Sequence, residues 1–425
     1  MSIDAGTGRI LRLGDQQVSL DAFLSYGFRP FFLGAAAFAV CAMAVWMAAI
    51  GAQQFGGSAD WLPVAGSIYA WHAHEMVLGF GIAAVAGFLL TAVPNWTGAL
   101  PLSGRPLLLL FGVWLAGRLA MAFSGLLPAV LVAATDLIFV PLLAAVATRQ
   151  LLVKPAQRNL MFLVILALIC AGNGAYHLGI SGTAAINGLA GVRLALVLLV
   201  LMIAVVGGRI VPAFTHNWLH VNAIPGGVPR RYPWLDATAI ASVAVFALLQ
   251  IVPVPDALAG VVALAAGLAN GLRLALWRGL ATRRAPIVWV LHVGYAWLVI
   301  GMLLAAMGAF AGGIWNMAAM HAFGVGAVGT MILAVMSRAS LGHTGRALVA
   351  PSAIVLAYYL ITLAAVLRVF GAAVVPAHYP EILLAAGSAW MAAFALFIYV
   401  FAPILATPRI SMLGPEAQRL NTGGS

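Results

Sequence analysis

Long, almost uninterrupted apolar segments constrain this chain more than any other feature. Each is close to the roughly 20 residues that an α-helix needs to cross the hydrocarbon core of a bilayer. Short connections rich in Pro, Gly and Asn separate them, as at Pro225-Gly226-Gly227. We therefore predict about twelve transmembrane helices. Their expected ranges are 28–52, 70–95, 106–123, 127–147, 159–178, 189–212, 234–252, 257–277, 286–310, 315–337, 351–371 and 381–405.

The composition agrees with a chain that is dissolved in lipid. Hydrophobic residues make up 64% of it and charged residues only 7%, whereas soluble domains carry roughly 25% charged residues. A backbone in lipid must satisfy its own hydrogen bonds, which leaves helix bundles and closed barrels. Barrel strands alternate apolar and polar residues, but these segments are continuously apolar. The predicted fold class is an all-α, polytopic bundle of membrane helices.

The positive charges predict the orientation. Lys and Arg lie in both terminal segments and in the loops after the even-numbered helices, and the loops after the odd-numbered helices have none. By the positive-inside rule, the even loops and both termini are cytoplasmic. We expect a cytoplasmic N-terminal arm (1–27), a membrane domain (28–405) and a cytoplasmic tail (406–425). This distribution explains the formal charge of +11 without nucleic acid as a partner. Cys41 and Cys170 lie inside apolar runs and form no metal or redox motif.

Several histidines are expected at similar depth. His72, His74, His177 and His321 fall near the outer ends of their helices, and His292 lies near the cytoplasmic end of 286–310. Neutral imidazole binds haem iron, copper and zinc, so these side chains could converge on a metal or a haem. The alternative is that each is an interfacial histidine bonded to the backbone.

His72 and His74 cannot reach one metal ion from a regular helix. Residues two positions apart point about 200° away from each other. We therefore expect two neighbouring centres, or one ligand and one supporting residue. Both His74 and His321 are followed by closely spaced glycines, which makes the second and tenth predicted helices similar to each other.

Charged side chains inside a membrane are costly and usually functional. Glu75 and Asp136 could relay protons or support a ligating histidine, and Glu75 could alternatively cap its helix. Arg118, Arg193 and Arg368 lie near outer helix ends, against the positive-inside pattern. Haem propionates at the outer surface would provide partners for them, and snorkelling to headgroups is the other explanation.

Motifs along nearly the whole chain resemble those of the NnrS family. They are Gly27-Phe28-Arg29-Pro30-Phe31-Phe32, Trp71-His72-Ala73-His74-Glu75-Met76, Ala86-Gly87-Phe88-Leu89-Leu90-Thr91-Ala92-Val93-Pro94-Asn95-Trp96-Thr97-Gly98, Arg158-Asn159-Leu160, Leu291-His292-Val293-Gly294-Tyr295-Ala296-Trp297 and Ser340-Leu341-Gly342-His343-Thr344-Gly345-Arg346. The resemblance implies a bacterial inner-membrane protein with haem and copper. It also implies a role in nitric oxide metabolism and in protection from nitrosative stress during denitrification.

A wider likeness is to the catalytic subunit of haem-copper oxidases and nitric oxide reductases. That fold also carries haem ligands on its second and tenth helices. This chain lacks the paired histidines of the seventh helix and a second histidine on the tenth. We carry over only the idea of one haem.

The leading hypothesis is a haem- and copper-containing protein that reduces or scavenges nitric oxide. It would be a candidate oxidoreductase that takes electrons from a quinol or from a donor that docks on the membrane face. His321 with His72 or His74 would hold the haem, and Arg118, Arg193 or Arg368 would pair with its propionates. The remaining histidine of the second helix could bind copper with His177, His292 could serve a second centre, and Glu75 could deliver protons. The alternatives are a nitric oxide sensor or metal-handling protein without turnover, and a proton-coupled transporter.

Overall fold

The computed structural model describes residues 2–3, 10–11, 18–54, 56–59, 61–182 and 187–410. Most of the predicted cytoplasmic arm and tail lies outside these residues. The elements are β1 Ser2–Ile3, β2 Ile10–Leu11, α1 Leu20–Phe23, α2 Phe28–Gln54, α3 Ile68–His74, η2 Glu75–Gly81, α4 Ile82–Thr97, α5 Gly104–Ala122, α6 Ala129–Leu137, α7 Phe139–Leu151, α8 Gln157–Ile180, α9 Gly188–Val221, α10 Pro233–Leu248, α11 Asp256–Leu276, η3 Gly279–Thr282, α12 Pro286–Ala311, α13 Ile314–His321, η4 Ala322–Gly329, α14 Thr330–His343, α15 Ser352–Val374, η5 Pro376–His378 and α16 Tyr379–Leu405.

The all-α polytopic fold is confirmed. Within the described residues, eleven helices are long and apolar enough to cross a membrane. The remaining predicted segment, 234–252, is the shorter apolar helix α10, which ends at Leu248. Pro253 and Pro255 follow closely, and proline both lacks an amide donor and keeps the residue before it out of the helical region. The prediction therefore extended this helix too far.

The fourth span is broken into α6 and α7 at Ile138. Pro141 explains the break, because it cannot donate to the carbonyl of Leu137, one turn earlier. Asp136 lies directly before the break, on the buried side of α6.

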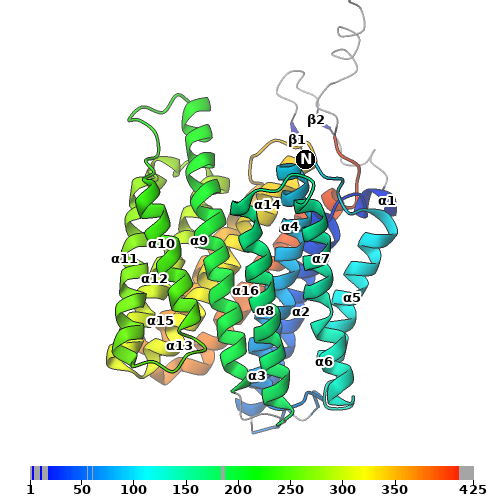
Figure 1. Cartoon of the computed structure of the whole chain (residues 1–425), viewed down its shortest axis with the longest axis vertical. Helices are drawn as coiled ribbons and strands as arrows, with labels where there is room; N and C mark the ends of the chain where they lie inside the picture. Colours follow the sequence, from blue (N-terminus) through cyan, green and yellow to red (C-terminus); the bar gives the residue numbers. More distant parts are fainter. Residues whose placement is uncertain are drawn as a thin grey trace, which may run out of the picture.

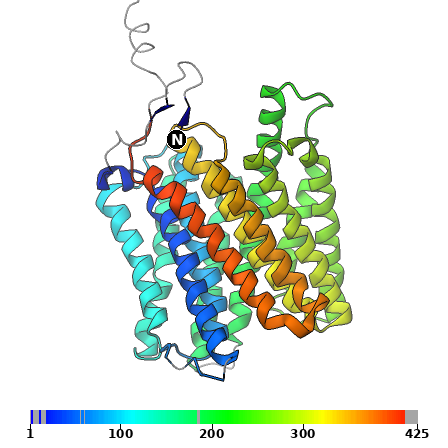
Figure 2. The ribbon, with the colours of Figure 1, turned by 180° about the vertical axis from the view of Figure 1, so that it is seen from behind.

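Both ends of the membrane bundle meet at one face (Figure 1). The amide of Ser19 donates to the carbonyl of Ala406 over 2.9 Å. Arg29 donates through Nη1 to the carbonyls of Leu405 and Thr407 over 2.7 and 2.6 Å. The first and last spans, α2 and α16, pack side by side, as seen from behind (Figure 2). We call this face the terminal end of the bundle and the other face the opposite end.

The second, sixth and tenth spans meet in the middle of the bundle. They comprise α3–η2–α4, α9 and α13–η4–α14, and contacts join η2 to η4 and both to α9. Their most apolar windows are 83%, 78% and 67% buried, and that of α12 is also 67% buried. Lipid therefore contacts mainly the remaining helices.

The second and tenth spans share an unusual interruption. The π-helix η2 begins directly after His74, and the π-helix η4 begins directly after His321. Such segments are rare and are frequently found at functional sites. The similarity of these two segments in sequence is thus accompanied by the same local backbone.

Candidate functional site

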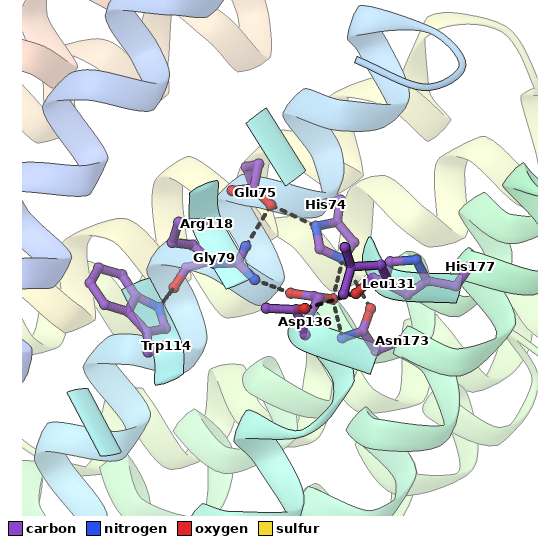
Figure 3. Close-up of polar contacts among 10 residues, drawn as sticks. His74, Glu75, Gly79, Trp114, Arg118, Leu131, Asp136, Asn173 and His177 are labelled. Atoms are coloured by element: carbon purple, nitrogen blue, oxygen red, sulfur yellow. Dashed lines mark hydrogen bonds and ion pairs between the residues drawn. The ribbon is translucent and has the colours of Figure 1, made fainter. Parts of the chain in front are cut away.

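A cluster of polar side chains, nearly all of them buried, lies inside the bundle (Figure 3). Four spans contribute one or two residues each, so the cluster exists only in the folded bundle. Its members are His74, Glu75, Arg118, Asp136, Asn173 and His177. We call it the His74 cluster.

His74 lies at its centre and is fully buried. Its Nδ1 is 2.8 Å from Glu75 Oε1, and its Nε2 is 2.9 Å from Asn173 Oδ1 and 3.3 Å from Asp136 Oδ2. Asn173 donates through Nδ2 to Asp136 over 2.7 Å, which leaves its Oδ1 as an acceptor. Both ring nitrogens of His74 thus face acceptors, and this arrangement favours a protonated ring.

Arg118 joins the two carboxylates of the cluster. It donates through Nη1 to Glu75 Oε1 over 2.5 Å and through Nη2 to Asp136 Oδ1. With His74 protonated, two positive and two negative charges balance in a buried site. Balance matters here because an unpaired charge in a membrane interior is costly.

Gly79 and Trp114 explain how the side chain of Arg118, on α5, can lie against the backbone of η2 in the second span. A Cβ atom at Gly79 would lie 2.5 Å from Phe38 and 2.9 Å from Arg118 Nη1, so only glycine leaves room for the guanidinium. Trp114 donates through its indole N–H to the carbonyl of Gly79 over 3.0 Å. The π-helix η2 is therefore tied to α5 by two side chains, and both are visible in Figure 3.

His177 closes the cluster on the side of α8. Its Nε2 donates to Asp136 Oδ2 over 2.9 Å. One ligand atom each of His74, Asp136 and His177 lies within 4.8 Å of the other two. Two imidazoles and a carboxylate form a donor set that suits divalent transition metals.

A separate pocket contains His72 and His321. It has an empty volume of about 350 Å³, and its wall also includes Met47, Arg368 and Trp390. The second and tenth spans thus each contribute one imidazole to a shared space. We call it the His72–His321 pocket.

The two imidazoles of this pocket are held differently. His321 Nδ1 donates to the carbonyl of Met317 over 2.9 Å, which leaves Nε2 as the unprotonated nitrogen. His72 stacks on Trp46 with 4.2 Å between the ring centroids. Its Nδ1 is buried without a hydrogen-bond partner in the described part of the chain.

The three predicted outer arginines have different surroundings. Arg118 is held by two carboxylates of the protein, and Arg193 is exposed on α9. Arg368 lies in the His72–His321 pocket with its guanidinium 5.9 Å from the centroid of the Tyr379 ring. Within the described residues, no carboxylate pairs with Arg368.

His292 joins neither group of histidines. Its Nε2 donates to the hydroxyl of Thr215 over 2.8 Å, since that hydroxyl itself donates to the carbonyl of Val211. It lies toward the terminal end of α12. The helix-cap explanation for Glu75 is excluded, because the helix begins at Ile68 and Ser67 caps it.

Sequence reasoning missed several members of these sites. Asn173 had a detectable signal, since it is an amide inside an apolar run, one turn before His177. A second buried network also escaped notice. In it, Arg273 donates to Asp236 over 2.8 Å and to Tyr295 over 2.7 Å. Because these groups satisfy one another, we interpret the network as structural.

Comparison with known proteins assigns most of the chain to one family. The family model described as NnrS protein matches residues 22–409. This range contains both histidine sites and every span of the bundle. No curated protein matches the chain.

Proposed function

The chain belongs to the NnrS family, and from this premise we propose that it binds haem and copper and acts on nitric oxide, by reducing or scavenging it. Family membership and the many apolar helices indicate a multi-pass membrane protein related to nitric oxide. The proposal adds the two cofactors, the reaction and a location in the bacterial inner membrane with cytoplasmic termini. The observation that carries it is that His72 and His321, on different spans, line one pocket with Arg368.

The residues of the His72–His321 pocket fit a haem. Metal-bound histidines almost always donate their other ring N–H to a carbonyl or carboxylate, and His321 does so to Met317. A Cβ atom at Gly324, one turn further along the tenth span, would meet nothing within 4 Å, so the backbone of η4 has open space at that position. Arg368 offers a cation to a propionate. When bound, haem would supply an iron that coordinates nitric oxide and accepts electrons.

The His74 cluster fits copper as its donor set, because imidazole and carboxylate groups bind divalent copper. His74 Nε2, Asp136 and His177 would hold the ion, which would take the place of the proton between His74 and its acceptors. The second span connects the His74 cluster to the His72–His321 pocket, since His74 and His72 are two residues apart.

Reduction of nitric oxide needs protons as well as electrons. Two molecules of nitric oxide, two electrons and two protons give nitrous oxide and water. We assign proton delivery to Glu75, because it is fully buried, it contacts His74, and its Oε2 has no hydrogen-bond partner in the described residues. A membrane quinol is the proposed electron donor.

Spectra and turnover test the proposal. The purified protein is expected to show a haem absorption spectrum, to contain copper by metal analysis, and to consume nitric oxide anaerobically with a reduced quinol while nitrous oxide forms. Glu75→Gln also removes a charge from the His74 cluster, so it is compared with the wild type at equal amounts of folded protein. It should keep the haem and slow turnover. A protein that contains haem and binds nitric oxide without turnover would favour the sensor instead, and a haem-free protein would refute the haem assignment.

A further inference from the structure

A third hollow lies at the terminal end of the bundle, between the second, sixth and tenth spans. Its empty volume is about 860 Å³, and its wall includes Phe88, Thr91, Phe214, Arg338 and His343. Neither histidine site contributes to it. We call it the Arg338 cavity.

A second, apolar hollow with an empty volume of about 590 Å³ lies next to it, toward the middle of the bundle. The two hollows share Phe32, Phe88, Ile210 and Val335 in their walls. Among the described residues, no charged side chain lines the apolar hollow, whose wall reaches Val328 on η4. The two adjoining hollows thus place a space with a polar, basic wall beside one with an apolar wall.

Arg338 is a cation without a counter-charge in the described residues. Its guanidinium carbon lies 3.8 Å from the centroid of the Phe214 ring, so a cation–π contact holds it at the wall. No carboxylate of the described residues pairs with it. Positive groups inside a membrane domain mostly face a partner, a cavity or the interface, which makes the cavity the place to seek its counter-ion.

The mouth of the cavity is shaped by aromatic stacking. His343 lies 6.2 Å from the Tyr26 ring and 5.5 Å from the Phe28 ring, centroid to centroid. No acidic residue of the described part of the chain lines the cavity, whereas Arg338 and His343 both do. The charges around the mouth therefore favour an anion.

We propose that this space binds one anionic amphiphile, with its phosphate or carboxylate headgroup against Arg338 and His343 and its hydrocarbon chain in the apolar hollow. Basic pockets between transmembrane helices are known binding places for anionic headgroups, and arginine pairs well with phosphate and carboxylate. A quinone is the weaker candidate, because a neutral headgroup leaves the charge of Arg338 uncompensated.

The test uses the full-length protein, delipidated in detergent and examined by native mass spectrometry. The probes are phosphatidylglycerol, oleate, phosphatidylcholine with the same chains, and ubiquinone. We expect one retained phosphatidylglycerol or oleate molecule, and these two arms distinguish the phosphate from the carboxylate. Arg338→Gln should weaken that binding about tenfold or more, the size expected for a hydrogen-bonded ion pair. Arg338→Lys should weaken it less.

Two further variants keep the test decisive if Arg338→Gln folds poorly. Ala92→Phe places a ring in the cavity wall and leaves the cation, and it should also reduce retention. Exposed Arg284 serves as the control, and Arg284→Gln should bind as the wild type does. Equal retention of phosphatidylcholine, retention of ubiquinone alone, or unchanged binding in both Arg338→Gln and Ala92→Phe would overturn the proposal.

Discussion

His72 and His74 lie on different sides of the same helix and belong to different sites. His72 stacks on Trp46 in the pocket that it shares with His321, whereas His74 is bonded to Glu75 and Asn173. Two positions along a helix turn a side chain by about 200°, so one span supplies two neighbouring centres with one imidazole each.

Removal of either imidazole of the His72–His321 pocket should release haem. His321→Ala and His72→Ala are each expected to lower haem affinity by about tenfold or more, because replacement of even a supporting residue costs roughly 10–100-fold at metal sites. The measurement is the haem-to-protein ratio after purification. His378 is exposed, and in the described part of the chain its charged neighbour is the exposed Glu381, so His378→Ala is the control. Full haem content in His321→Ala would contradict the assignment.

Arg368 should matter for haem retention more than the other outer arginines do. Arg368→Leu removes the cation of the pocket and is expected to weaken haem binding about tenfold, the value of a charge-assisted hydrogen bond. Arg193→Leu should have no effect, since Arg193 is exposed. Titration of the apoprotein with haem measures both. If the two variants bind haem equally well, Arg368 does not pair with a propionate.

Asp136 should be essential for stability. Asp136→Asn leaves Arg118 and His74 with one carboxylate between them, and loss of one member of a buried ion pair costs about 3–5 kcal/mol. The unfolding temperature in detergent should fall clearly. Glu381→Gln, at an exposed carboxylate, should leave it unchanged.

The double variant Arg118→Leu with Asp136→Leu separates charge from packing. It removes one charge of each sign, so it should be more stable than Asp136→Asn alone. Stability of Asp136→Asn equal to that of Glu381→Gln would show that the four charges are not coupled.

The positions of most membrane-spanning helices could be predicted from the sequence, because lipid imposes their length and their apolar surface. The sequence also implied the divergence of His72 and His74, which follows from helix geometry. It missed the early end of α10, although Pro253 and Pro255 were visible, because the apolar run continues to Val252.

The composition of the His74 cluster could not be predicted in the same way. Asp136 lies 62 positions after His74, and their contact depends on how each helix is rotated about its axis. The break before Pro141 and the π-helix after His74 both set that rotation. Local departures from regular helix geometry, with little signal in an apolar pattern, thus decide which polar groups meet.

Orientation in the membrane has a direct test. In a background of Cys41→Ser and Cys170→Ser, cysteines at Ser181 and Gly312 should react with an impermeant reagent added outside the cell, because their loops lie at the opposite end. A cysteine at Gly227, at the terminal end, should react only after the membrane is opened. The reversed pattern would place both termini outside.

Copper should depend on His177 and His74, and haem should not depend on His177. His177→Ala removes one nitrogen of the site with His74 and Asp136 without touching the wall of the His72–His321 pocket. Metal analysis should find copper reduced at least about tenfold, whereas the haem spectrum should remain. His292 provides a matched comparison, since it is bonded to Thr215 and joins neither site. His292→Ala should keep copper, because only the two imidazoles that face Asp136 can share an ion with it. Copper retained in His177→Ala and lost from His292→Ala would move the copper site to the terminal half of the bundle.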